Sequence, residues 1–267
     1  MGKPSRPPGS ATRWSDLRRR AVSAAVLAPI VLLCIWFGSV PFVTLVLAGA
    51  IGLAIEWAGL CRTPPTALPG LLVPLLVVLA GLAAAFGYAG PAILILLVSA
   101  LVVGWLARRL LLASGIVYVG LAVVALLWLR GWDGNGRAPV FFVVLVVWSS
   151  DIGAYLAGRL LRGPKLAPAL SPAKTWSGAA GGLIAAMLVG EALAARVTVA
   201  TALFAALLAV ACQAGDLLES GIKRHVGVKD SGRLIPGHGG LLDRLDGLLA
   251  AAPVAALVVL ASREGLF

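Results

Sequence analysis

The chain has 267 residues, of which 60% are hydrophobic and only 12% are charged, and its mean hydropathy is +1.00. Soluble globular domains carry about 25% charged residues, so this composition excludes a water-soluble domain and predicts an integral membrane protein. The formal charge of +11 does not indicate nucleic acid as a partner, because the basic residues lie between apolar runs and not on a face interleaved with stacking aromatics.

Residues 1–20 are rich in Pro, Ser and Arg, and we interpret them as a basic cytoplasmic leader. Nine apolar segments follow, and we interpret each as a membrane-spanning helix. Their predicted bounds are Ala21–Phe37, Val40–Leu60, Ala67–Phe86, Pro91–Ala107, Leu111–Leu129, Ala138–Ala157, Trp176–Ala195, Val197–Ala214 and Leu248–Ala261. The predicted fold class is therefore an all-α, polytopic membrane protein with about nine transmembrane helices. Trp57 and Trp176, near the ends of two segments, are interpreted as anchors at the membrane interface.

The distribution of Lys and Arg predicts the orientation of these helices, because basic residues collect on the cytoplasmic side of a membrane. With nine spans and the N-terminus inside, 18 of the 22 basic residues face the cytoplasm and 4 face outward. The four that face outward are Arg130, Arg137, Arg196 and Arg263. We therefore expect the N-terminus inside and the C-terminus outside.

The remaining chain divides into N-terminal transmembrane helices, residues 21–137, and a C-terminal transmembrane part, residues 138–267, with cytoplasmic loops 158–175 and 215–247. Small residues in the C-terminal part, such as Gly178, Gly181 and Gly182, are interpreted as places where helices pack closely and not as phosphate-binding turns. The three cysteines are scattered without a CxxC pair, so neither a disulfide framework nor a zinc site is predicted.

The loop at 215–247 carries both signs of charge at high density, with five of the eleven acidic residues of the chain. Mg²⁺ prefers oxygen ligands such as carboxylates and substrate phosphates, and Lys or Arg neutralise phosphate oxygens. Asp243 and Asp246 are three residues apart, so they share one face if the last helix begins near Gly240. On the residues alone, a site for a metal and a phosphorylated substrate and a charged loop that merely anchors two helices are equal alternatives.

The order of residues in both loops resembles the phosphatidate cytidylyltransferase (CDP-diacylglycerol synthase) family. In the second loop the resemblance rests on Ser220-Gly-Ile-Lys223-Arg224, Lys229-Asp230 and Pro236-Gly-His238-Gly239-Gly240-Leu-Leu-Asp243-Arg244-Leu-Asp246. In the first it rests on Asp151-Ile-Gly-Ala-Tyr155-Leu-Ala-Gly158-Arg159 and Leu170-Ser171-Pro-Ala-Lys174-Thr-Trp176. The chain departs from the family pattern at Ser177, where an acidic residue is expected, and at Gly247, where a hydroxyl residue is common.

The resemblance implies a nucleotidyl transfer in which CTP and phosphatidic acid give CDP-diacylglycerol and pyrophosphate for phospholipid biosynthesis. It implies a protein of the bacterial inner (plasma) membrane with its active site facing the cytoplasm. It also implies Mg²⁺ as cofactor, with a second cation left open, and it leaves a homodimer open. The expected metal ligands, which are also catalytic candidates, are Asp216, Asp243, Asp246 and Asp230. The expected phosphate-binding side chains are Lys223, Arg224, Lys174, Lys229 and Arg244. Ser171 and His238 are expected to donate hydrogen bonds to phosphate, and Gly239 and Gly240 to let the backbone approach it. Which basic residue binds which phosphate stays open.

Three acidic residues lie inside apolar segments, where a charge costs roughly 2.5 to 3.5 kcal/mol on insertion scales. We expect Asp151 to shape the polar cavity, by holding a cation, positioning a substrate hydroxyl or pairing with a loop Lys or Arg. Glu56, which can reach the membrane surface, and Glu191 are interpreted as structural. The alternatives are a CDP-alcohol phosphotransferase and a transporter of an anionic metabolite. The paired-Asp helix pattern of the first family is not found in this sequence, and a transporter would not explain why charges of both signs crowd into one loop.

Overall fold

The computed structural model describes residues 25–64, 66–131, 136–194, 198–232 and 239–263, with the side chain of residue 263 excluded. Within these residues eight helices are long and apolar enough to cross a membrane. They are α2 Ser39–Leu60, α3 Leu68–Ala85, α4 Ala89–Ala107, α5 Leu110–Gly131, α6 Arg137–Leu160, α7 Trp176–Leu193, α8 Val199–His225 and α9 Leu242–Arg263. A shorter apolar helix, Ala25–Phe37, precedes them. The predicted all-α, polytopic fold class is confirmed, while its orientation across a membrane stays a prediction.

Two predicted helix boundaries are wrong, and both concern the charged loop. Helix α8 continues to His225 instead of ending at Ala214, and α9 begins at Leu242 instead of Leu248. The charged residues there lie on helical turns, so a search for apolar runs misses those turns. The connection is consequently only residues 226–241, and most of the chemically interesting side chains sit on helices.

The first predicted loop contains a small antiparallel hairpin that the sequence did not indicate. Strand β1, Lys165–Ala167, pairs with β2, Ser171–Thr175, and Lys165 lies opposite Thr175. Helix α7 starts directly after β2, where the Thr175 hydroxyl accepts a hydrogen bond from the Gly178 amide over 3.1 Å. This N-cap fixes the strand to the helix, so that the side chains of β2 are held at a defined position next to the bundle.

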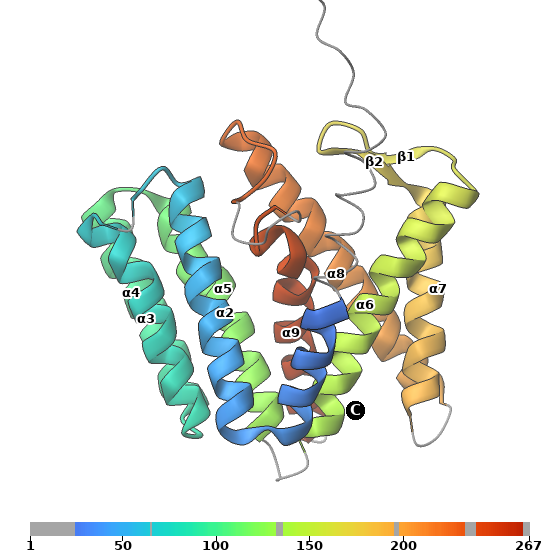
Figure 1. Ribbon diagram of the computed structural model, residues 1–267, viewed down its shortest axis with the longest axis horizontal. Helices are drawn as coiled ribbons and strands as arrows, with labels where there is room; N and C mark the ends of the chain where they lie inside the picture. The colour runs from blue at the N-terminus through green and yellow to red at the C-terminus, as the bar shows by residue number, and fades with distance from the viewer. Residues whose placement is uncertain (1–24, 65, 132–135, 195–197, 233–238, 264–267) are drawn as a thin grey trace, which may run out of the picture.

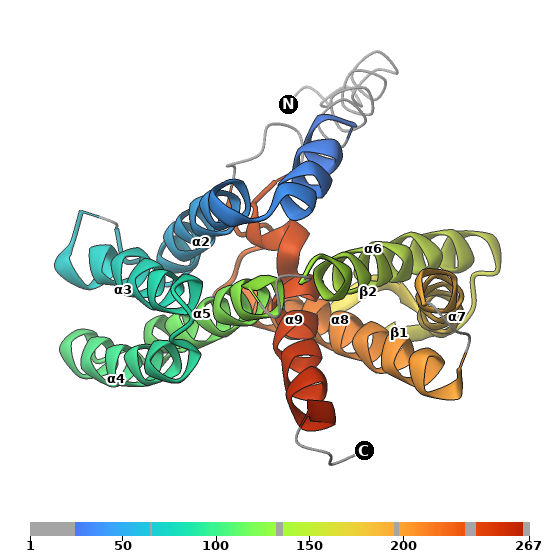
Figure 2. The same ribbon diagram turned by 90° about the horizontal axis from the view of Figure 1, so that it is seen from below.

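The helices form two groups on either side of α9, with α2 to α5 in one group and α6 to α8 in the other (Figure 2). Helix α9 packs against α8 from one group and α5 from the other. Figure 1 shows the β-hairpin and the α8–α9 connection at one end of the bundle and the C-terminal end of α9 at the other. Polar segments distant in the chain are therefore gathered at one end.

Small residues bring α6 and α7 into close contact, as the sequence predicted. A Cβ added to Gly181 would lie 2.2 Å from Ala157 Cβ, and one added to Gly178 or Gly182 would approach a backbone carbonyl of α6 to within 3.0 Å. In contrast, the assignment of Trp57 as an interface anchor is wrong. Trp57 is 1% exposed, its ring fills the space beside Gly115, and its Nε1–H donates to the Leu111 carbonyl over 2.8 Å.

Candidate active site

Lys223 on α8 lies between two carboxylates at the polar end of the bundle. Its Nζ is 2.6 Å from Asp243 Oδ1 on α9 and 3.1 Å from Glu219 Oε1, one turn earlier on α8. Lys223 is 9% exposed and Glu219 is fully buried. Charges are buried only when they are paired, so this triad ties the last turns of α8 to the first turn of α9.

Asp243 is further held by the backbone of the α8–α9 connection. Its Oδ2 accepts hydrogen bonds from the Gly240 amide over 2.9 Å and from the Ser231 amide over 3.0 Å. Gly239, at φ +85°, is so close that an added Cβ would lie 3.2 Å from this oxygen. Asp243 thus holds both the backbone of the connection and the Lys223 ammonium group, and its two oxygens accept hydrogen bonds from three donors.

Asp246, one turn further along α9, faces a different set of neighbours. It lies within electrostatic reach of Asp216, Glu219 and Asp151, and its Oδ1 accepts a hydrogen bond from the Gly247 amide over 2.8 Å. Among the described residues, Asp246 has no basic ion-pair partner. Gly247 itself packs on Cys212, since an added Cβ would lie 2.4 Å from the sulfur. The departure from the family pattern at this position therefore has a packing reason.

Asp216 and Asp151 complete an acidic region next to the hairpin. Lys174 on β2 places its Nζ 2.5 Å from Asp216 Oδ2, so the hairpin is joined to α8 by an ion pair. Asp151 on α6 accepts a hydrogen bond from the Cys212 thiol over 3.4 Å. Four carboxylates thus lie in one region, and two lysines pair with carboxylates there. The carboxylates are Asp151, Asp216, Glu219 and Asp246, and the lysines are Lys174 of the hairpin and Lys223 of α8.

The other predicted site residues lie around this cluster, and most are exposed. Arg224 donates to the Val228 carbonyl over 3.3 Å, while Lys229, Asp230 and Arg244 are exposed. Ser171 begins β2 and is partly buried. His238 lies outside the described residues. The departure at Ser177 is also accounted for, because its hydroxyl donates to the Arg162 carbonyl and lies 3.0 Å from the Thr175 hydroxyl.

Two carboxylates of this region were not predicted as site residues. Glu219 has a sequence signal, since it precedes Lys223 by four residues and follows Asp216 by three, on one helix face. Glu56 on α2 was interpreted as structural but expected near the membrane surface. It is instead 5% exposed, and its carboxylate accepts hydrogen bonds from the amides of Leu241 and Leu242 and from the Ser231 hydroxyl. Its pairing with a residue 186 positions away has no local signal.

The carboxylates suit a hard cation in chemistry, although they do not form a closed ligand set. Asp216, Asp246 and Asp151 offer oxygen ligands of the kind Mg²⁺ prefers, and Oε2 of buried Glu219 has no hydrogen-bond partner in the described part of the chain. No three or more His, Cys, Asp or Glu side chains within the described ranges converge closely enough to hold an ion by themselves. Mg²⁺ commonly takes only one or two carboxylates and completes its shell with waters and substrate phosphates, so these residues fit it as a partner of a bound nucleotide.

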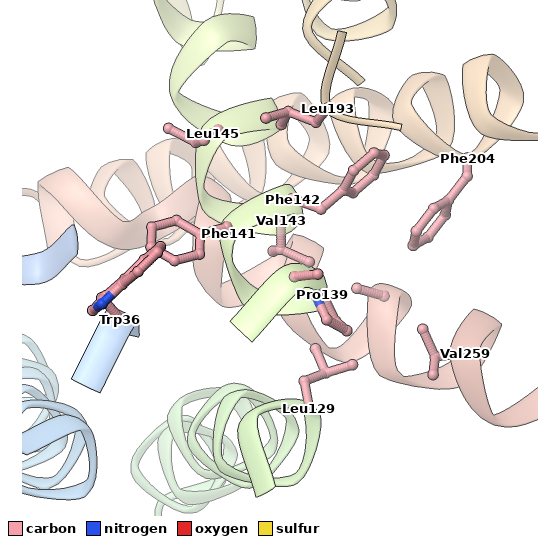
Figure 3. Close-up of a pocket in the computed structure, with 12 residues that line it drawn as sticks. Trp36, Leu129, Pro139, Phe141, Phe142, Val143, Leu145, Leu193, Phe204 and Val259 are labelled. Carbon is pink, nitrogen blue, oxygen red and sulfur yellow. The ribbon is translucent and has the colours of Figure 1, made fainter. Parts of the chain in front are cut away.

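Two cavities elsewhere are apolar and do not suit phosphate chemistry. One, of about 580 Å³, is lined by Trp36, Phe141, Phe142, Phe204 and Val259 among others (Figure 3). It lies near the starts of α6 and α8 and the end of α9, away from the hairpin. The second, of about 490 Å³, lies between Leu111, Leu170 and mostly apolar residues of α8, with His225 also in its lining. Neither contains a carboxylate or a lysine, so the paired charges at the α8–α9 end remain the candidate site.

The fold and the site define a polytopic membrane protein with a charged, oxygen-rich site at one end of its helix bundle. The model of the cytidylyltransferase family matches residues 18–262. The chain therefore belongs to the cytidylyltransferase family, and the resemblance noted in its two loops is confirmed.

Three relatives, each named phosphatidate cytidylyltransferase, show how far the similarity extends. The protein of Brucella suis is 43% identical over 252 residues, which cover 89% of this chain and 91% of the relative. The Staphylococcus saprophyticus protein is 43% identical over 150 residues, covering 54% and 56% of the two chains. The Bacillus subtilis protein is 40% identical over 142 residues, covering 51% and 53%. The similarity to the first relative therefore includes the N-terminal helices.

Proposed function

We propose that this protein transfers the cytidylyl group of CTP to phosphatidic acid, which makes CDP-diacylglycerol and pyrophosphate. A phosphate oxygen of the lipid attacks the α-phosphorus of CTP, a new P–O–P bond forms, and the bond from the α-phosphorus to the bridging oxygen of the β-phosphate breaks. The electron pair leaves with pyrophosphate. The observation that carries the proposal is the paired lysine and carboxylate cluster at the end of α8 and α9, in a chain 43% identical to a phosphatidate cytidylyltransferase over 89% of its length.

The attacking group is already an anion, so the reaction needs alignment and charge compensation more than a strong base. Lys223 and Lys174 are the cations best placed for this role, because each is held by a carboxylate on α8. When phosphate oxygens arrive, they can take over part of the contacts that these ammonium groups make with Asp243 and Asp216. Arg224, Lys229 and Arg244 are exposed and suited to an approaching triphosphate, and Ser171 and His238 are proposed as hydrogen-bond donors to it.

Mg²⁺ is proposed as the cofactor. The partners that each carboxylate already has indicate which of them is the better candidate ligand. Asp246 and Asp216 are the first candidates, because they lie within electrostatic reach of one another and Asp246 has no basic partner in the described ranges. Asp243 and exposed Asp230 remain further candidates, although the oxygens of Asp243 already accept from Lys223 and two amides. When bound, the cation would neutralise negative charge on the attacking and leaving oxygens.

Labelled CTP tests this function. Purified protein in phosphatidic acid micelles with magnesium should move a label on the α-phosphate into an organic-soluble lipid and a label on the γ-phosphate into pyrophosphate. Replacing CTP by dCTP, UTP and ATP in the same assay measures the base and sugar selectivity. A lipid product labelled from the γ-phosphate, or no labelled lipid, would contradict the proposal.

A further inference from the structure

We infer that Glu56 is a positioning residue for the α8–α9 site, although it belongs to α2 in the N-terminal group of helices. The inference rests on the proposed function, since the site it positions is the proposed active site. Glu56 Oε1 accepts from the Leu241 amide over 3.0 Å, and Oε2 accepts from the Leu242 amide over 2.8 Å and from the Ser231 hydroxyl over 3.2 Å. In the described part of the chain, all three hydrogen-bond donors lie in the connection or at the first residue of α9.

A single buried carboxylate therefore joins the two ends of a short stretch of chain. Ser231 precedes Leu241 by ten residues, and both bind Glu56. The amides of Leu241 and Leu242 belong to the group of helix-start donors that have no partner within the helix, and a negative charge at this place is favoured by the helix dipole. Three donors also offset the cost of burying the charge of Glu56 at 5% exposure.

Two glycines of the α8–α9 connection make room for the Glu56 carboxylate. A Cβ added to Gly232 would lie 2.4 Å from Glu56 Oε1, and one added to Gly240 would lie 2.7 Å from Oε2. Both distances are shorter than real Cβ contacts, so glycine at these two positions is what allows the chain to close around the carboxylate. The glycines next to the charged helix start therefore serve the contact with α2 as well as any approach to phosphate.

Glu56 is linked to the proposed phosphate-binding lysine through one residue and one carboxylate. Ser231 donates its hydroxyl to Glu56 and its amide to Asp243. Asp243 in turn lies 2.6 Å from Lys223. A loss of Glu56 releases Ser231 and the start of α9 together, so Asp243 and Lys223 lose the framework that fixes them. Glu56 touches no reacting atom in this arrangement and acts through Asp243 and Lys223.

The test compares Glu56→Ala and Glu56→Gln with the matched control Glu191→Gln. Glu191 is also an acid inside a span, and its Oε2 accepts a hydrogen bond from the Thr198 amide over 3.1 Å. It lies near the C-terminal end of α7, away from the hairpin and the α8–α9 site. We expect kcat/KM for CTP to fall about tenfold to a hundredfold in Glu56→Ala and by a smaller factor in Glu56→Gln, which keeps the size and one carbonyl acceptor. Glu191→Gln should retain the turnover of the unaltered protein.

A double-mutant cycle with Lys223→Ala separates positioning from general support of the fold. If Glu56 acts through Lys223, the loss in the double variant is much smaller than the product of the two single losses. Amide hydrogen exchange at Leu241 and Leu242 should also be faster in Glu56→Ala, because both amides lose their acceptor. This measurement does not depend on enzyme activity. Should Glu56→Ala fail to insert, Glu56→Gln carries the same comparison.

The outcomes that overturn the inference differ from those that overturn the function. Turnover like that of the unaltered protein in folded Glu56→Gln and Glu56→Ala, or fully multiplicative losses with Lys223→Ala, would remove the positioning role alone. A fall in melting temperature with unchanged kcat/KM of the folded protein would do the same. An unaltered protein that makes no labelled lipid would instead refute the proposed function, and the positioning role with it.

Discussion

Lys223 and Asp243 are 20 residues apart in the chain, and their side chains meet at 2.6 Å between α8 and α9. The contact joins the end of one spanning helix to the start of the next. Because Glu219 holds the same ammonium group from the other side, Lys223 has two anionic partners before any substrate is present. Its proposed role in phosphate binding and its role in the fold are therefore not separable by a single truncation.

Replacing Lys223 by alanine should consequently lower both activity and stability. Removing one partner of a buried ion pair leaves an uncompensated charge, which typically costs about 3 to 5 kcal/mol. We expect turnover to fall about a hundredfold or more and the melting temperature in detergent to fall clearly. Thermal unfolding and kcat/KM, measured on the same preparation, would contradict this if the melting temperature stayed unchanged.

Arg224→Ala should behave differently, although it is the next residue. Arg224 is exposed and donates only to the Val228 carbonyl in the described contacts. We expect unchanged stability, within about 0.5 kcal/mol, and a raised KM for CTP. Steady-state kinetics over a CTP series measure this, and an unchanged KM would exclude Arg224 from substrate binding.

Lys174→Ala tests the contribution of the hairpin. The Lys174–Asp216 pair is partly exposed, so its loss should change stability by less than about 1 kcal/mol. If Lys174 binds phosphate, kcat/KM should nevertheless fall about tenfold or more. A variant with normal kinetics would return this ion pair to a purely structural contact between β2 and α8.

Asp246→Asn and Asp243→Asn should be distinguishable by magnesium titration. Asn keeps the size of Asp but removes the charge that a hard cation requires. Asp246→Asn should therefore lose activity or need far more magnesium at little cost in stability. Asp243→Asn should lower the melting temperature too, because Asp243 accepts from Lys223, Ser231 and Gly240. The same magnesium dependence as the unaltered protein in Asp246→Asn would remove it from the metal site.

The predicted orientation can be tested by cysteine labelling in a background without native cysteines. Arg137 is the first residue of α6, and Lys165 lies in β1 just after the helix ends, so the two mark its opposite ends. We expect a cysteine at position 137 to react with an impermeant reagent from outside and one at position 165 only from the cytoplasm. The opposite pattern would invert the topology.

Much of the helical framework could be predicted because spans need long apolar runs, and such runs are visible in the sequence. The end of α8 could not, because Asp216, Glu219 and Lys223 lie on helical turns whose charges make the segment look like a loop to any measure of hydropathy. The start of α9 at Leu242 was missed by the apolar run but agrees with a last helix that begins near Gly240. The C-terminal site residues could be proposed from their local order. Glu56 could not, since its partners lie at the other end of the chain and no short-range pattern encodes that contact.

We propose that cytidylyl transfer takes place at the carboxylates and lysine where α8 meets α9. The most direct measurement is single-turnover transfer of label from α-phosphate-labelled CTP to phosphatidic acid, by the unaltered protein, Asp246→Asn and Glu191→Gln at saturating magnesium. We expect labelled lipid from the unaltered protein and from Glu191→Gln, and a loss of at least about a hundredfold in folded Asp246→Asn. Equal rates for all three proteins, or no labelled lipid from any of them, would contradict it.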